Sequence, residues 1–175
     1  GQPVMLAHYN HGLRENADRD ELFSKETARM NNLIFFSEKG NVTQFAVENK
    51  LSIEEGARIA RYRFLTHIAR ENNIHLIATA HHADDQVETV LMHLFRGSGM
   101  KGLTGMRGRS VLPEFDDEIQ IIRPLLSFWR KEIENYCHRN RLNSIEDETN
   151  ESMVYLRNKI RNAILPILEN EYPGL

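Results

Sequence analysis

The chain has 175 residues, of which 41% are hydrophobic and 27% are charged, and its formal net charge is −3. This length and composition allow one globular domain with a sizeable core. The net charge excludes a protein that is basic over its whole surface, so nucleic-acid binding would need a local basic patch. No apolar run approaches the roughly 20 residues of a membrane span, and the single cysteine, Cys137, excludes an internal disulfide and a Cys-x-x-Cys site.

The first 51 residues predict two buried strands joined by a helix. An apolar run over Val4–Tyr9 forms the first strand, and the second covers Leu33–Phe36. The helix between them is capped by Asn16 or Asp18 and runs to about residue 31. Its inward side chains are expected to be Leu22, Phe23 and Met30. Residues 40–51 are ambiguous, with a short helix as one interpretation.

Ser52 and Glu55 form a capping box that opens the next helix. The residues expected on its core side are Ala57, Ala60, Phe64, Leu65 and Ile68. Arg58 and Arg61 lie on the same helix. Arg58 follows Glu54 at the i,i+4 spacing, so a solvated ion pair on the helix surface is an alternative to a functional role for Arg58.

A central strand follows and passes directly into a helix. Residues 76–78 are apolar without alternation, as expected for a parallel strand covered on both faces. From Asp84 the spacing becomes helical, with Val87, Val90, Leu91 and Leu94 inward and Gly97 as the stop. The order strand, helix, strand, helix, strand, helix predicts a parallel sheet with right-handed crossovers.

The junction between this strand and helix contains two imidazoles and two carboxylates, those of His81, His82, Asp84 and Asp85. Ligands of open α/β sheets lie at the carboxyl ends of strands, so the position favours a functional site. Carboxylates in a first helical turn also interact favourably with the helix dipole, so capping is the alternative.

Residues 96–109 form a glycine-rich segment with four cations and no acid. The segment matches neither the P-loop nor the GxGxxG pattern. One interpretation is a mobile loop that contacts phosphates through backbone N–H groups and cations, and the other is a flexible surface connection. The cations are Arg96, Lys101, Arg107 and Arg109.

The last third of the chain predicts a hairpin and two helices. Residues 114–118 are expected to form an acidic turn before a strand over residues 119–122, and Ser127 is a candidate cap for the following helix. The side chains expected to lie partly inward on that helix are Trp129, Ile133, Tyr136 and Cys137. A final helix begins near Met153 and is kinked or restarted by Pro166. On it Arg157 and Arg161 share one face, which is either functional or a solvated basic surface.

Six segments in this order resemble the tRNA(Ile)-lysidine synthases, members of the N-type ATP pyrophosphatase (PP-loop) family. The segments are residues 8–14, 52–62, 78–89, 96–106, 122–126 and 157–161. The resemblance implies an α/β fold with a Rossmann-like, adenine nucleotide alpha hydrolase-like parallel sheet and helices on both faces, followed by a mostly helical part. It places a partial PP-loop domain at residues 1–126 and a helical extension at residues 127–175.

The phosphate loop of this family, Ser-Gly-Gly-x-Asp-Ser, should precede the segment around His8, and it is absent from these 175 residues. The C-terminal tRNA-binding domains of longer members would follow Leu175. The sequence is therefore expected to be a fragment of a catalytic domain that is inactive alone.

The resemblance also implies a reaction. Family members use ATP to adenylate C2 of the wobble cytidine in a tRNA(Ile) with a CAU anticodon, and the ε-amine of free L-lysine then displaces AMP to give lysidine. The implied cofactors are ATP and Mg²⁺, the implied location is the cytoplasm without membrane contact, and a homodimer is a possible assembly.

Site roles follow from the same resemblance. Catalytic roles fall to Asp84, Asp85, His81 and Arg58, with Asp85 also the metal ligand. Nucleotide or substrate binding falls to His8, Asn10, His11, His82, Arg61, Arg157 and Arg161. The tRNA contact falls to Arg96, Lys101 and Arg107. Glu88, one turn beyond Asp84, is expected to bond a loop amide.

Three rival functions stay open. A zinc hydrolase could use His8, His11, His81 and His82 with Asp84, although the chain has no HExxH signature. A PP-loop thiolase would need paired cysteines or an iron–sulfur cluster, which Cys137 alone cannot supply. A non-catalytic nucleotide-binding domain is the third.

Overall fold

The computed structural model describes residues 4–13, 16–100, 102–145 and 156–172. The chain forms two compact units, the first made of residues 1–77 and 111–121 and the second of residues 78–110 and 122–175. The chain therefore passes between the units three times. The expected division at residue 126 remains a prediction.

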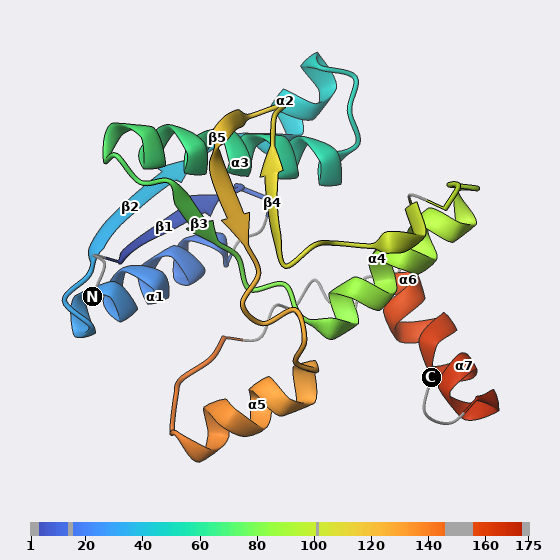
Figure 1. Cartoon of the computed structure of the whole chain (residues 1–175). Coiled ribbons are helices and arrows are strands. Elements are labelled where there is room, and N and C mark those ends of the chain that lie inside the picture. Colours follow the sequence, from blue (N-terminus) through green and yellow to red (C-terminus); the bar gives the residue numbers. More distant parts are fainter. Residues whose placement is uncertain (1–3, 14–15, 101, 146–155, 173–175) are drawn as a thin grey trace. The chain divides into compact units, whose positions relative to one another are not determined.

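The first unit begins with a parallel pair of strands (Figure 1). Strand β1 (Met5–Asn10) pairs with β2 (Ile34–Lys39), and the register runs from Met5 opposite Ile34 to Asn10 opposite Lys39. Helix α1 (Ala17–Met30) connects them. The predicted strand–helix–strand crossover at the start of the chain is confirmed.

Helices cover both faces of this strand pair, as predicted. Successive side chains of a strand point to opposite faces, and in β1 His8 contacts Ser24 of α1 with 3.2 Å between Nδ1 and Oγ. The next side chain, Tyr9, packs against Phe64 of helix α3 (Ile53–Glu71) with 5.7 Å between ring centroids. Tyr9 and His8 thus mark the two covered faces.

The ambiguous segment before α3 contains a short helix, α2 (Val42–Glu48). The predicted start of α3 is correct, because the Glu55 N–H donates to Ser52 Oγ at 3.2 Å. Of the five side chains expected to face the core, only Phe64 is fully buried. The helix also buries Tyr62 and Ala69, which are seven residues apart and therefore lie on one face.

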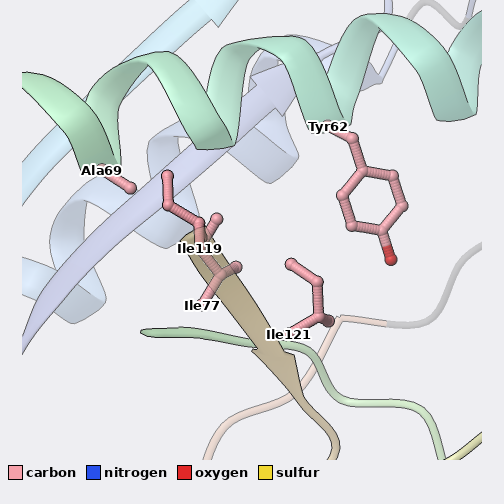
Figure 2. Close-up of a cluster of buried hydrophobic side chains, with 5 residues drawn as sticks. All are labelled: Tyr62, Ala69, Ile77, Ile119 and Ile121. Atoms are coloured by element: carbon pink, nitrogen blue, oxygen red, sulfur yellow. The ribbon is translucent and has the colours of Figure 1, made fainter. Parts of the chain in front are cut away.

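Those two side chains cover a second sheet, with strand order β3–β5–β4. Its strands are β3 (Leu76–Ala78), β4 (Arg109–Leu112) and β5 (Asp116–Ile122). Figure 2 shows Ile77, Ile119 and Ile121 below Tyr62 and Ala69 of α3. These five side chains form a hydrophobic core cluster in the first unit.

Strands β3 and β5 run parallel. The Gln120 N–H donates to the His75 carbonyl at 2.9 Å, and the Thr79 N–H donates to the Ile122 carbonyl at 3.0 Å. The pairing advances in the same direction along both strands, which only parallel strands do. β4 and β5 instead form a hairpin, closed by a Phe115 N–H to Leu112 carbonyl bond of 2.9 Å.

Several predicted inward positions of the first unit are wrong. Leu22 and Met30 of α1 are exposed, and α1 instead buries Ala17 and Ala28, small side chains that let the helix approach its neighbours closely. In β3 only Ile77 is buried, so the expectation of cover on both faces fails for Leu76 and Ala78.

The second unit is mostly helical, as expected for the C-terminal part. It contains α4 (Ala83–Phe95) and α5 (Arg130–Arg139). Near the end of the chain it contains α6 (Leu156–Lys159), a π-helical turn (Ile160–Ile164) and α7 (Leu165–Glu171). Pro166 occupies the start of α7, where its missing N–H costs little, so the predicted restart is confirmed. The expected start near Met153 lies outside the described residues.

Three predictions for the helices of this unit need correction. Leu94 is exposed, and α4 buries Glu88 and Met92 instead. Helix α5 begins after Trp129, whose N–H bonds Glu132 at 2.8 Å, and not after Ser127. Trp129 and Tyr136 are exposed. Within the described part of the chain, no helix is long and apolar enough to cross a membrane.

The predicted acidic turn is shorter than expected, because Asp116 begins β5 and is buried. Its carboxylate accepts the N–H groups of Glu118 and Ile119 at 2.8 and 2.9 Å and pairs with the Arg70 guanidinium. The Arg70 bond, together with these backbone bonds, lowers the pKa of Asp116 from 3.8 to about 2. Burial of this charge is tolerated because it is paired and hydrogen-bonded.

We predict that Asp116→Ala lowers the free energy of unfolding by about 2–3 kcal/mol at neutral pH, since two backbone donors lose their acceptor. Because folding lowers this pKa, the stabilisation is complete above pH 3.8 and is lost as the pH falls towards 2. Urea unfolding at several pH values measures both effects. Asp117→Ala, at an exposed neighbour, is the matched control, and equal losses in the two variants would contradict the prediction.

Candidate functional site

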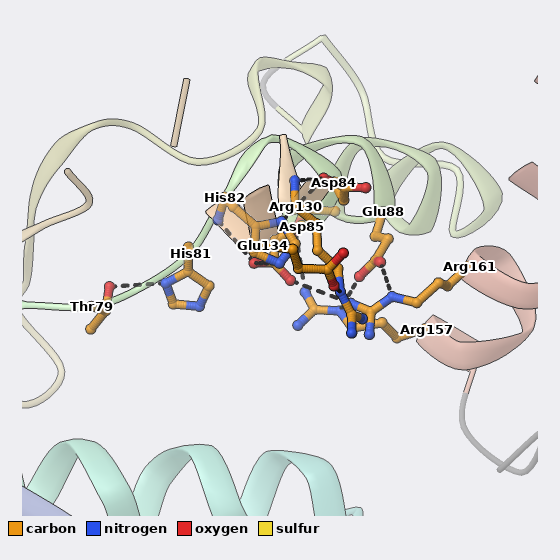
Figure 3. Close-up of polar contacts among 11 residues, drawn as sticks. Thr79, His81, His82, Asp84, Asp85, Glu88, Arg130, Glu134, Arg157 and Arg161 are labelled. Atoms are coloured by element: carbon orange, nitrogen blue, oxygen red, sulfur yellow. Dashed lines mark hydrogen bonds and ion pairs between the residues drawn. The ribbon is translucent and has the colours of Figure 1, made fainter. Parts of the chain in front are cut away.

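The two acids of the strand–helix junction, Asp84 and Asp85, accept hydrogen bonds from backbone N–H groups (Figure 3). His82 is the N-cap of α4 with an extended backbone, and its N–H donates to Asp85 Oδ2 at 3.0 Å. The other oxygen of Asp85, Oδ1, lies 3.6 Å from the Arg161 guanidinium. Asp85 therefore caps the helix, as the capping alternative expected, and also faces a cation. Its functional role stays a prediction.

Asp84 joins two helices. Its Oδ2 accepts the N–H of Arg130, the first residue of α5, at 2.9 Å. A carboxylate at a helix N-terminus is stabilised by the unpaired N–H groups and by the dipole. The Ala83 N–H bonds the Phe128 carbonyl at 2.9 Å beside it. Asp84 therefore has a structural role, because it accepts a backbone hydrogen bond at the start of α5.

The two histidines of the junction have different surroundings. His82 lies between the acids, with Nδ1 3.3 Å from Asp84 Oδ2 and Nε2 3.5 Å from Asp85 Oδ2. His81 is bonded through Nδ1 to Thr79 Oγ1 at 2.9 Å. That bond orients the His81 ring just beyond the carboxyl end of β3.

Glu88 is fully buried and binds two arginines rather than the loop amide expected from the sequence. Arg161 Nε donates to Glu88 Oε1 at 2.6 Å, and Arg157 Nε lies 3.3 Å from Oε2. Burial raises the pKa of Glu88, and the two guanidinium groups act in the opposite direction. Arg157 also donates to Thr89 Oγ1 at 3.2 Å.

Arg157 and Arg161 share one face, as predicted, and that face is turned towards α4. Their side chains are only 32% and 22% exposed, so the alternative of a solvated basic surface is wrong. Together with Asp85 and Glu88 they form a cluster of two carboxylates and two guanidinium groups, which we call the carboxylate–arginine cluster. The two negative and two positive formal charges of the cluster balance, so the protein can bury these side chains without leaving a charge unpaired.

Glu88, at the centre of this cluster, was not among the predicted site residues. A signal was present, because Asp85, Glu88 and Met92 follow at intervals of three and four residues and therefore lie on one helical stripe. An acid in the same stripe as a buried methionine needs a cationic partner. The two arginines four residues apart near the end of the chain supply it.

The polar residues at the end of β1 make local contacts within the first unit. Asn10 is buried, and its side-chain N–H groups donate to Asp18 at 2.8 Å and to Glu21 at 3.0 Å. Its side-chain oxygen accepts the Gly12 N–H at 3.1 Å. Asn10 thereby fixes the turn in which His11 lies, with the His11 ring 5.1 Å from that of Tyr9.

Arg58 also has partners in the first unit, and Glu54 is not among them. Its guanidinium lies 3.6 Å from Glu114 and 5.1 and 5.6 Å from the rings of Tyr62 and Phe115. Arg61 lies 5.5 Å from the Tyr62 ring. These cation–π contacts hold planar, half-exposed guanidinium groups in place.

The glycine-rich segment is attached to α4 and does not lie free of it. Gly97, with φ +70°, ends α4, and the Ser98 N–H returns to the His93 carbonyl at 2.9 Å. Arg96, Arg107 and Arg109 are exposed. Lys101 lies outside the described residues.

Among residues 4–13, 16–100, 102–145 and 156–172, no group of three or more His, Cys, Asp or Glu side chains is placed to hold a metal ion. Asp85 offers a single hard oxygen ligand. One carboxylate suits Mg²⁺ when substrate phosphates supply further oxygens.

Comparison with known proteins gives one consistent result. The sequence model of the PP-loop domain matches residues 1–168. The tRNA(Ile)-lysidine synthase of Pseudothermotoga lettingae is 45% identical over 95% of this chain, and that of Thermosipho africanus is 41% identical over 97%. The chain spans 35% and 38% of the length of these two relatives.

A solved structure has the same fold. The U34-tRNA thiolase NcsA from Methanococcus maripaludis, with its 4Fe–4S cluster, superposes with a TM-score of 0.74 over 98% of this chain and 58% of its own. The two sequences are 16% identical, so this likeness concerns the fold.

We predict that Glu88→Ala lowers the free energy of unfolding by about 3–5 kcal/mol, because it leaves two partly buried guanidinium groups without their carboxylate. Chemical denaturation measures the loss. The matched control is Glu134→Ala, which removes an exposed partner of Arg130 and should cost less than about 1 kcal/mol. A loss at Glu88 no larger than the loss at Glu134 would argue against the carboxylate–arginine cluster.

Proposed function

The chain belongs to the PP-loop family of ATP-binding domains, and we propose that the complete protein uses ATP to join free lysine to C2 of the wobble cytidine in a CAU-anticodon tRNA(Ile). The identity of about 40% or more to tRNA(Ile)-lysidine synthases, over nearly the whole chain, is the observation that carries the proposal.

The reaction has two steps. The C2 oxygen of the cytidine attacks the α-phosphorus of ATP, and pyrophosphate leaves. The lysine ε-amine then attacks C2, the bond from C2 to the adenylate oxygen breaks, AMP leaves, and the amine loses a proton. These steps require cations near the phosphates and an acceptor near the amine.

The carboxylate–arginine cluster contains groups of both kinds. We assign Arg157 and Arg161 to the ATP phosphates, because planar guanidinium groups suit phosphate oxygens. Asp85 is assigned to the lysine amine or to Mg²⁺, which would neutralise the triphosphate when bound. Asp84 supports the helix start beside it and shares the catalytic assignment. His81 and His82 are assigned to the nucleotide or cytidine pocket.

Residues of the first unit complete the proposal. Arg58 and Arg61 are assigned to phosphate or to the anticodon nucleotide, and the side chains of both residues are at least partly exposed. The polar end of β1 is assigned to substrate binding through His8, Asn10 and His11. Arg96, Lys101 and Arg107 are assigned to the tRNA backbone. A cytoplasmic location and a homodimer belong to the same proposal.

The direct test incubates the complete gene product with ATP, Mg²⁺, labelled lysine and a CAU-anticodon tRNA(Ile). We expect label in the tRNA that depends on ATP and disappears when the wobble base is changed from cytidine. Release of AMP that depends on tRNA but leaves no label in it would point to a different nucleophile and would overturn the assignment of lysine.

We predict that Asp85→Asn lowers lysine transfer by at least about 100-fold, because the amide cannot accept the amine proton or bind Mg²⁺ as a carboxylate does. The fold should survive, since an asparagine oxygen can still accept the His82 N–H. Single-turnover transfer and circular dichroism measure the two effects. Asp117→Asn, at an exposed residue of β5, is the control, and wild-type turnover of Asp85→Asn would refute the assignment.

A further inference from the structure

Gln86, in the first turn of α4, binds both backbone groups of one loop residue. Its side-chain N–H donates to the Met106 carbonyl at 3.0 Å, and the Met106 N–H donates to Gln86 Oε1 at 2.7 Å. The amide therefore pairs with Met106 as a neighbouring strand would. We call this pair of hydrogen bonds between Gln86 and Met106 the Gln86 clamp.

The loop is shaped to fit this side chain. Gly105 has φ +61°, a backbone conformation that favours glycine. A Cβ atom at Gly105 would also lie only 2.7 Å from the Gln86 side-chain nitrogen. A larger residue would thus strain the backbone and displace the clamp.

Two further contacts hold the same loop. His93, two turns further along α4, bonds the Gly102 carbonyl through Nδ1 at 2.7 Å. On the other side, Arg123 Nη1 donates to the Arg107 carbonyl at 2.8 Å and to Ser110 Oγ at 2.9 Å. The backbone on both sides of Arg107 is therefore fixed, while the Arg107 side chain is exposed.

We propose that Gln86 is a positioning residue. It fixes the backbone of the glycine-rich segment, so that Arg107 contacts the tRNA phosphates at a defined position relative to Asp85 on α4. This inference rests on the proposed function. Gln86 directly follows Asp85, so one helical turn carries both Asp85 and the contact with the loop. A loop ordered before binding loses less conformational entropy when the RNA binds, and a displacement of about 1 Å is enough to slow a reaction.

The test uses Gln86→Met in the complete gene product, because methionine keeps the length of the side chain and removes both hydrogen bonds. We expect the KM for tRNA to rise roughly tenfold, while the KM values for ATP and lysine stay within about twofold of the wild type. Hydrogen exchange at the Met106 amide should become faster. Arg107→Glu should raise the same KM and flatten its salt dependence.

The matched control is Gln44→Met, which removes an exposed side-chain bond to Glu48 on α2 and should change none of these values. Gln86→Glu keeps an acceptor for the Met106 N–H and loses the donor, so it should give intermediate values. It also serves as the second variant if Gln86→Met fails to fold.

The outcomes separate the clamp from the proposed function. Unchanged exchange at Met106 would overturn the clamp itself, whatever the enzyme does. Faster exchange with an unchanged KM for tRNA would overturn the positioning role. Equal rises in all three KM values with a lower melting temperature would mean that Gln86 is merely structural. A wild-type protein without lysine transfer would overturn the proposed function, and the exchange rate would still decide whether the clamp exists.

Discussion

The buried carboxylate of Glu88 is the constraint on which the second unit depends. It is fully buried and lies within 2.6 Å of Arg161 and 3.3 Å of Arg157. A buried carboxylate without a cation would be very costly, so the segment after residue 155 must pack where its arginines reach α4. The same two contacts bring Arg161 beside Asp85, at the carboxyl end of β3. One interaction thus sets the packing of the last helices and the charge of the proposed active site.

Other side chains in the first turns of α4 also bind the surrounding segments of the chain. Asp84 bonds the start of α5, and Asp85 closes the start of α4 itself. Gln86 holds the glycine-rich loop, and Glu88 holds the last helices. Four side chains within five residues therefore contact four parts of the chain. These structural contacts explain the many polar residues at the start of α4, and they do not require every one of these residues to be catalytic.

The sequence predicted most of the elements, since strand patterns, the Ser52 cap and the Pro166 restart are local signals. It failed where burial depends on distant partners. Asp116 was predicted to lie in an acidic turn, but it is buried and pairs with Arg70, 46 residues away in the sequence. Glu88 was undervalued because its arginines lie 69 and 73 residues further along the chain. The junction acids and histidines were predictable as a group, but their structural contacts were not, because those contacts involve α5 and the last helices.

If Glu88 and Arg161 stabilise each other as a pair, a double-mutant cycle of unfolding free energies measures their coupling. Glu88→Met alone leaves Arg161 without its closest carboxylate, whereas the double variant with Arg161→Met replaces the pair by apolar side chains of similar length. We expect the double variant to be more stable than the sum of the single losses implies, by at least about 1.5 kcal/mol. Losses that add to within about 0.5 kcal/mol would contradict it.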